Sequence, residues 1–305
     1  MEINATTKLC AVLGQPIHHS ASPAMQNAAL KELGLNWRYL AFEVDPKDLK
    51  AVIAGAKAMR FVGLNLTVPH KLMALEWVDI VDESARFWGA INTIRFEGRG
   101  PDDEWVPLAK LGAERVQEVR SRGFNTDADA IIRALREDAR CEVRGLRVLL
   151  LGAGGAGRVA ALRLAAEGVA ELYLVNRTQD KCNQIALEIN RAFPNVRTVV
   201  GYPSTPVDLV MNATSAGLNP QDPLPWDVSR YSLKGTTVAF DMIYRPAKTP
   251  FLAMAEGAGC RTANGLGMLL FQGAKSLELW SGQVAPVEVM RRALLRNIYG
   301  DTPQE

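Results

Sequence analysis

The sequence predicts an α/β fold built from two domains, and three observations support this. The chain has 305 residues, which is more than a single hydrophobic core usually organises. Strand-like apolar runs alternate with helix-like segments along most of the chain. One apolar run ends in a glycine-rich loop, residues 152–157, that leads directly into a helix-like segment. We therefore expect layered sheets covered by helices.

The first third of the chain alternates between strand and helix signals. Pro23 lies in the first turn of a predicted helix with Ser22 as its N-cap, and Gly34 follows the end of that helix. The predicted strands span residues 9–13, 38–44 and 61–68, and a second helix spans residues 46–58. This alternation predicts a parallel sheet.

Residues 96–122 have a different character. They are rich in charge, contain Gly98, Gly100 and Pro101, and include a plausible amphipathic helix over residues 108–119. We interpret this stretch as an insertion or an elaborated connection, most simply one on the surface.

The remainder returns to alternation. A helical segment begins at Asp127, a helix ends at Glu167, and two helices close the chain, over residues 267–279 and 286–297. The predicted strands span residues 148–151, 171–175, 209–211 and 237–240.

Bulk composition excludes several classes of protein. With 35 basic and 33 acidic residues, the chain has no charge excess that would favour nucleic acid or a membrane surface as a partner. No apolar run approaches membrane-spanning length, and the N-terminus lacks the apolar core of a secretory signal. We expect a soluble, cytoplasmic protein.

Metal and redox sites are not supported by the cysteines and histidines. The four cysteines are far apart and form no Cys-x-x-Cys pair, so we expect buried or inert thiols: Cys10, Cys141, Cys182 and Cys260. Two of the three histidines are adjacent, which is a poor spacing for metal ligands: His18, His19 and His70.

The loop after the strand at residues 148–151 carries a Gly-x-Gly-x-x-Gly pattern. Such glycines allow a tight turn, a close approach to a pyrophosphate and close helix–sheet contact, and the helix N-terminus attracts the phosphates. The alternative is a glycine-rich entry into a helix, but the preceding strand and a second strand about twenty residues on favour a Rossmann-type dinucleotide site. The predicted loop comprises Gly152, Ala153, Gly154, Gly155, Ala156 and Gly157.

The end of the second strand bears on the choice between NAD and NADP. NAD sites usually carry an acidic residue there, but this chain has Asn176, Arg177 and Thr178, with Lys181 one turn later. A guanidinium, a hydroxyl and an ammonium suit a 2′-phosphate. The alternative is that Thr178 only caps the next helix while the two cations are solvated, and Asp180 is an argument for NAD. We predict NADP.

Four polar clusters stand out on the substrate side. Each has an ordinary explanation when taken alone, such as a capping serine, a solvated lysine or an asparagine in a turn. Ser20 and Ser22 place two hydroxyls at a helix N-terminus, where a carboxylate would be favoured. The other clusters are Gly63 to Lys71, Gly89 to Thr93, and Gly123 to Asp127.

Together these motifs resemble the shikimate dehydrogenase family. Their order is Ser-x-Ser-Pro, Asn-x-Thr-x-Pro-x-Lys, Gly-Ala-x-Asn-Thr and Gly-x-Asn-Thr-Asp, followed by the glycine loop and Asn-Arg-Thr. The resemblance runs from about Leu9 to Trp280 and includes residues 212–217, the segment from Asp241 to Tyr244, and Gly265 to Gln272.

The resemblance implies the NADP-linked, reversible reduction of 3-dehydroshikimate to shikimate in the biosynthesis of aromatic amino acids. It implies a substrate domain over residues 1–126 and 266–305, and an NADP domain over residues 127–265 with the last helices returning to the first domain. It also implies that Ser20 and Ser22 hold the substrate carboxylate. Further substrate or pocket residues would be Asn65, Thr67, Lys71, Asn92, Asp127, Tyr244 and Gln272. Further cofactor residues would be Thr214, Met242 and Gly265. We expect a monomer or a homodimer that binds a small-molecule substrate.

Elementary chemistry supports Lys71 and Asp127 as the catalytic pair of such an enzyme. Adding a hydride to a ketone creates an alkoxide that must gain a proton. Lys71 can donate that proton and stabilise the oxyanion, while Asp127 holds the ammonium and binds a hydroxyl. Which of the two is formally the acid–base stays open.

Two departures from the family pattern leave alternatives open. Gln26 stands where the family commonly has histidine, and residues 96–122 form a longer connection than usual. A quinate or aminoshikimate dehydrogenase is the nearest alternative, although paired Ser20 and Ser22 favour shikimate over the bulkier quinate. A catalytically silent nucleotide-binding regulator is a third reading, against which the retention of Lys71 and Asp127 argues.

Overall fold

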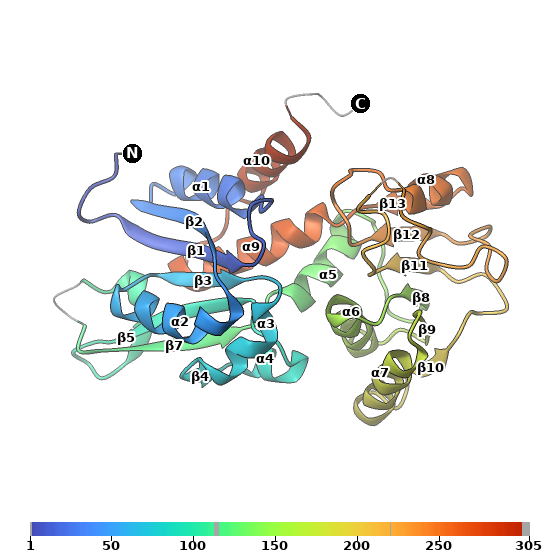
Figure 1. The fold of residues 1–305 in the computed structure, drawn as a ribbon, viewed down its shortest axis with the longest axis horizontal. Coiled ribbons are helices and arrows are strands. Elements are labelled where there is room, and N and C mark those ends of the chain that lie inside the picture. Colours follow the sequence, from blue (N-terminus) through green and yellow to red (C-terminus); the bar gives the residue numbers. More distant parts are fainter. Residues whose placement is uncertain (1, 113–115, 220, 301–305) are drawn as a thin grey trace. The chain divides into compact units, whose positions relative to one another are not determined.

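The computed structural model describes residues 2–112, 116–219 and 221–300 (Figure 1). The chain divides into two compact units. Unit 1 comprises residues 1–127 and 270–305, and unit 2 comprises residues 128–269. Each unit has its own sheet, as the length of the chain and the alternation of elements predict.

Unit 1 contains a mixed sheet of seven strands in the order β2-β1-β3-β5-β7-β4, with β6 paired to β5. The strands are β1 (Lys8–Gly14), β2 (Trp37–Glu43), β3 (Gly63–Leu66), β4 (Ile80–Val81), β5 (Thr93–Arg99), β6 (Trp105–Pro107) and β7 (Glu118–Phe124). β1 pairs in parallel with β2 and β3, whereas β5 is antiparallel to β3 and to β7. The parallel arrangement predicted for the first third of the chain is therefore confirmed for β1, β2 and β3, and the sheet becomes mixed where β5 joins β3 in the antiparallel direction.

Helices cover both faces of this sheet. The helical segments of the region are α1 (Ser22–Glu32), η1 (Pro46–Asp48), α2 (Leu49–Ala58), α3 (His70–Met73), η2 (Ala74–Glu76), α4 (Glu83–Trp88), η3 (Leu108–Lys110), α9 (Leu266–Ser281) and α10 (Val287–Tyr299). Leu49 and Ile53 of α2 belong to the same buried core cluster as Leu64 of β3. On the opposite face, the indole of Trp280 in α9 lies directly over Gly63, where a Cβ would be 2.0 Å from Nε1. Successive strand residues face opposite sides, so Asn65, two residues after Gly63, points to the α9 side.

The beginning of α1 differs by one residue from the prediction. Ala21 occupies the N-cap position, and Ser22 is the first helical residue. Pro23 lies in the first turn as expected, and Gly34, just past the end, has a φ of +65°. Ser20 Oγ accepts a hydrogen bond from the backbone N–H of Ser22 at 3.4 Å, so both serines still lie at this helix start.

The predicted amphipathic helix over residues 108–119 is wrong where the structure describes it. Residues 108–110 form a single 3-10 turn, β7 begins at Glu118, and residues 113–115 lie outside the described part. Leu108 is buried, and Leu108, Leu111 and Val116 lie closest to the space that a Cβ on Gly98 would occupy. Their apolar spacing thus serves packing over β5, and the ends of the supposed insertion are paired strands of the sheet.

Unit 2 is built on a fully parallel sheet of six strands in the order β10-β9-β8-β11-β12-β13. The strands are β8 (Arg147–Leu151), β9 (Glu171–Val175), β10 (Arg197–Val200), β11 (Leu209–Asn212), β12 (Val238–Asp241) and β13 (Arg261–Ala263). The helices are α5 (Asp127–Glu137), α6 (Gly155–Ala166), α7 (Gln179–Ala192) and α8 (Pro250–Gly257). The order reverses between β8 and β11, and in open parallel sheets ligands bind at such a switch point. This topology agrees with the Rossmann-type prediction.

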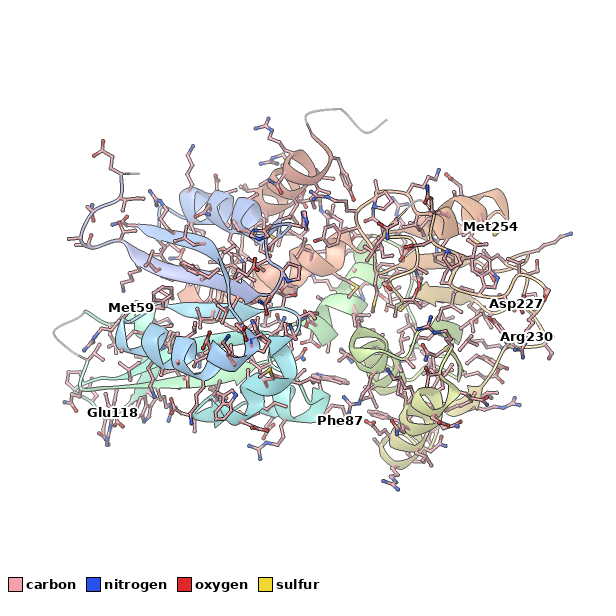
Figure 2. The ribbon with its side chains drawn as sticks, viewed as in Figure 1. Met59, Phe87, Glu118, Asp227, Arg230 and Met254 are labelled. Carbon is pink, nitrogen blue, oxygen red and sulfur yellow. The ribbon has the colours of Figure 1, made fainter. Side chains whose placement is uncertain are left out.

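The remaining surface and thiol features are unexceptional. All four cysteines are free and buried, and burial raises the pKa of Cys141 to about 11, so the buried thiols stay protonated at neutral pH. Figure 2 labels three exposed apolar side chains: Met59 directly after α2, Phe87 in α4 and Met254 in α8. Single exposed apolar residues are normal in folded proteins.

Among the described residues, no helix is long and apolar enough to cross a membrane, and no group of three potential metal ligands occurs.

Candidate active site

The central feature of unit 1 is an ion pair between Lys71 and Asp127. Lys71 lies in α3, in the segment that follows β3, and Asp127 is the first residue of α5. Lys71 Nζ lies 2.7 Å from Asp127 Oδ2, with the two side chains 32% and 24% exposed. A charge-assisted contact of this length is short and strong for its class. Both groups therefore remain within reach of a small molecule from solvent while holding each other in place.

Asn92 holds the other oxygen of the same carboxylate. Its Nδ2 donates to Asp127 Oδ1 at 2.8 Å and to Thr126 Oγ1 at 2.9 Å. Its Oδ1 accepts from the backbone N–H of Thr126 at 2.8 Å. The backbone N–H of Ile91 donates to the Lys71 carbonyl at 2.8 Å. Asn92 thus fixes the orientation of the carboxylate that Lys71 contacts.

Asn65 lies at the centre of a buried hydroxyl cluster. The hydroxyl of Tyr39 donates to Asn65 Oδ1 at 2.8 Å. Asn65 Nδ2 donates to Ser276 Oγ at 2.9 Å, to Thr93 Oγ1 at 3.1 Å and to the Asn92 carbonyl at 3.2 Å. Burial raises the pKa of the Tyr39 phenol well above its ordinary value. The cluster therefore connects β2 and α9 with the segment that carries Asn92.

The other predicted substrate residues occupy neighbouring elements of unit 1. Thr67 is half-buried directly after β3, with its methyl group against the backbone of Gly14. Gln272 is half-buried on α9, and its backbone carbonyl accepts a hydrogen bond from Thr126 Oγ1 at 3.1 Å. Gln26, the departure from the family pattern, is fully buried and donates through Nε2 to the Gly273 carbonyl at 2.9 Å. At this position the glutamine ties α1 to α9.

The glycine loop of unit 2 contains glycines of two kinds. Gly152 has a φ of +107°, and a Cβ on Gly157 would lie 2.2 Å from the Gly152 carbonyl oxygen. These two glycines are therefore required by the close contact of loop and helix. A Cβ on Gly154 or Gly155 would meet nothing within 4 Å. The space over these two residues, at the N-terminus of α6, is the kind of cradle in which a pyrophosphate approaches backbone N–H groups.

The predicted 2′-phosphate residues follow β9. Asn176 Oδ1 accepts from the backbone N–H of Ala153 at 3.2 Å, which ties this segment to the glycine loop. Arg177, Thr178 and Lys181 are exposed, and their side chains make no hydrogen bond or ion pair with any described residue. Thr178 takes the N-cap position of α7 without a capping side-chain hydrogen bond, so the alternative in which its hydroxyl only caps this helix is not supported. Asp180 lies in the first turn of α7, where the helix dipole favours an acidic residue for structural reasons.

The strand ends of β11 and β12 complete the predicted cofactor side. Asn212 Oδ1 accepts from the N–H and the hydroxyl of Thr214 at 3.0 and 2.7 Å. Gly265 lies against the backbone of Met242, since a Cβ there would be 2.0 Å from the Met242 carbonyl oxygen. Tyr244 follows β12 in unit 2 and is half-buried, and burial raises the pKa of its phenol. The ligand contacts of all these residues remain predictions.

Sequence reasoning did not single out two members of the unit 1 cluster. Tyr39 and Ser276 are fully buried, and each forms a hydrogen bond directly with Asn65. For Ser276 a signal existed, because it lies four residues after Gln272 and therefore on the same helix face. Tyr39 carried no signal beyond its place in an apolar strand.

Three family profiles match the chain. The profile described as the shikimate dehydrogenase substrate binding domain matches residues 12–94. The profile of shikimate / quinate 5-dehydrogenase matches residues 135–219, and that of the shikimate 5'-dehydrogenase C-terminal domain matches residues 265–295. The matches fall in both units.

Full-length relatives agree with these profiles. A curated shikimate dehydrogenase (NADP+) of Methanopyrus kandleri is 38% identical, covering 98% of each chain. One of Moorella thermoacetica is 41% identical, covering 96% of this chain and 95% of its own.

Solved structures of the same fold include enzymes that are named for different activities. A shikimate dehydrogenase in complex with NADP+ has a TM-score of 0.81 and 34% identity over 97% of this chain and 98% of that chain. A 5-ketofructose reductase of Gluconobacter sp. strain CHM43 has a TM-score of 0.77 and 31% identity over 95% and 99%. The quinate dehydrogenase of Corynebacterium glutamicum, solved with NAD, has a TM-score of 0.78 and 27% identity over 95% and 99%.

Proposed function

Because this chain belongs to the shikimate dehydrogenase family, we propose that it catalyses the NADP-dependent, reversible reduction of 3-dehydroshikimate to shikimate. The observation that carries the proposal is the Lys71–Asp127 pair held by Asn92, which supplies the proton donor that ketone reduction needs. A silent nucleotide-binding regulator would have no use for this arrangement.

The residues of unit 2 fit a bound dinucleotide phosphate. The free space over Gly154 and Gly155 accommodates the pyrophosphate. The cations of Arg177 and Lys181, which pair with no side chain in the described part of the chain, suit a 2′-phosphate. When bound, the reduced nicotinamide supplies the hydride. Thr214, Met242 and Gly265 are proposed to border the same nucleotide.

The residues of unit 1 bind the ketone and handle the proton. Ser20 and Ser22 hold the carboxylate through hydroxyls at the start of α1, and Asn65, Thr67 and Gln272 contact ring hydroxyls. Tyr244 is proposed as a further substrate residue.

Negative charge develops on the ketone oxygen as the carbon is reduced. The Lys71 ammonium stabilises that charge and donates the proton, while Asp127 accepts from both Lys71 and Asn92 and so keeps the ammonium oriented.

Replacing Arg177 with alanine is expected to raise KM for NADP about tenfold or more and to leave KM for NAD nearly unchanged. The reason is that a charge-assisted hydrogen bond to the 2′-phosphate is lost, and NAD lacks that phosphate. Arg191→Ala removes the same charge from the last turn of α7 and serves as the control. Equal KM values for NADP in the Arg177 variant and the unmodified protein would remove Arg177 from the cofactor site.

Steady-state assays of shikimate and quinate, each with NADP and NAD, test the proposed substrate and cofactor against the alternatives within the family. We expect the highest kcat/KM for shikimate with NADP. The quinate dehydrogenase relative makes quinate the proper competing substrate. A preference for quinate or for NAD would overturn the corresponding part of the proposal.

A further inference from the structure

The hydroxyl cluster around Asn65 restricts how its amide can be oriented. Asn65 is 5% exposed, and Tyr39, Thr93 and Ser276 are completely buried around it. Asn65 belongs to β3, and its three partners belong to β2, β5 and α9, in the same order as they are named above. Figure 1 shows where these elements lie. None of these three partners was among the predicted substrate residues.

The backbone carbonyl of Asn92 determines the orientation of the Asn65 side-chain amide. The carbonyl of Asn92 lies 3.2 Å from Asn65 Nδ2, and a backbone carbonyl can only accept a hydrogen bond. The amide nitrogen must therefore face Asn92, and the amide oxygen must face Tyr39. Tyr39 then has to donate its single hydroxyl proton to Asn65 Oδ1, at 2.8 Å.

Ser276 completes the constraint from α9. Its hydroxyl donates to the Gln272 carbonyl at 2.9 Å, which leaves its lone pairs to accept from Asn65 Nδ2 at 2.9 Å and from Thr93 at 2.8 Å. The two hydrogens of Asn65 Nδ2 thus have three acceptors within the protein. The remaining capacity of Asn65 is the second lone pair of its Oδ1.

We propose that Tyr39 and Ser276 are positioning residues that hold the Asn65 amide with its oxygen available, so that Asn65 accepts a hydrogen bond from a substrate hydroxyl. This inference rests on the proposed function, in which Asn65 contacts the substrate ring. It adds a direction to that contact, since a substrate hydroxyl must donate to Asn65. A ring that carries only a hydrogen-bond acceptor at that position would place this acceptor against the Asn65 amide oxygen. We expect the protein to reject such a ring.

The test compares two variants with two matched controls. Tyr39→Phe removes the donor to Asn65 Oδ1, and Ser276→Ala removes an acceptor of Nδ2. We expect KM for shikimate to rise about tenfold in the first and about threefold in the second, because a buried polar group loses a partner. KM for NADP should stay unchanged, and kcat should change much less than KM for shikimate.

The controls remove the same groups elsewhere. Tyr231→Phe removes a buried tyrosine hydroxyl of unit 2 that accepts from the Val207 N–H at 3.1 Å. Ser281→Ala removes a serine of α9 that donates to the Leu277 carbonyl at 2.7 Å, as Ser276 does to Gln272. Both controls should keep the KM for shikimate of the unmodified protein.

Combining Tyr39→Phe with Asn65→Ala tests whether Tyr39 acts through Asn65. In the Asn65→Ala background, Tyr39→Phe should have no further effect on KM for shikimate. Two results would overturn this inference and leave the proposed function standing. One is an active protein in which Tyr39→Phe and Ser276→Ala both keep the KM for shikimate of the controls. The other is an equally large rise in KM when Tyr39→Phe is made in the Asn65→Ala background. An unmodified protein without shikimate turnover would overturn the proposed function and this inference with it.

Discussion

Lys71→Ala is expected to lower kcat for shikimate oxidation about a hundredfold or more, with a modest change in KM. The substitution removes the ammonium that lies 2.7 Å from Asp127 and leaves that carboxylate, among the described residues, with Asn92 as its remaining side-chain partner. In the proposed site, hydroxyl and amide groups elsewhere in unit 1 make most of the substrate contacts, which is why KM should change less than kcat. Steady-state kinetics at saturating NADP measures both quantities.

Lys71→Arg separates the loss of the proton donor from the loss of the positive charge, and Lys57→Ala serves as the control. Lys71→Arg keeps a cation for Asp127, but a guanidinium does not give up its proton under these conditions, so kcat should remain low. Lys57→Ala breaks a comparable ion pair of unit 1, 3.0 Å from Asp79, and should leave kcat unchanged. Near-normal kcat in Lys71→Ala would remove Lys71 from the mechanism.

The glycine loop gives the second large effect, and substitutions at two of its glycines should differ in their effect on Tm while both weaken NADP binding. Gly157→Ala places a Cβ 2.2 Å from the Gly152 carbonyl oxygen, so helix and loop must move apart. Such overpacking typically costs about 1–3 kcal/mol. We expect a lower Tm together with loss of NADP binding. Thermal unfolding followed by circular dichroism, and NADP titration, measure the two.

Gly154→Ala is the matched variant. A Cβ there meets nothing within 4 Å, so Tm should not fall, but it enters the space proposed for the pyrophosphate. KM for NADP should therefore rise about tenfold or more in a fully stable protein. Unchanged NADP affinity in Gly154→Ala would contradict the assignment of this loop to the cofactor.

Elements whose signal is local were predictable from the sequence. The strand that became β9 has the predicted bounds, and β8, β11 and β12 differ by one or two residues. Their continuous apolar runs are typical of strands buried on both faces of a parallel sheet. The glycine loop was predictable for the same reason, because strand, loop and helix follow one another without interruption.

The region between β5 and β7 was not predictable, because long-range pairing decides it. Leu108, Leu111 and Val116 have a spacing compatible with a helix, but they pack over Gly98 instead. The antiparallel register, with Arg99 opposite Glu118, sets the ends of the excursion. Nothing in the local sequence states which distant strand will be the partner.

The candidate site was predictable in part. The sequence pointed to Lys71, Asp127 and Asn92, and the structure brings these three side chains into direct contact, although their roles toward a ligand stay predictions. Ser276 and Tyr39 escaped notice because a serine in a helix and a tyrosine in a strand have ordinary explanations. Only the three-dimensional fold shows that both contact Asn65.

Direct transfer of hydrogen from shikimate to NADP tests the central claim most directly. The protein is incubated with NADP and with shikimate that carries deuterium on the carbon bearing the reacting hydroxyl, and the reduced cofactor is analysed by mass spectrometry. The account predicts NADPH that contains one deuterium, formed by the unmodified protein and about a hundredfold more slowly by Lys71→Ala. A folded protein that binds NADP but yields no labelled NADPH would contradict it.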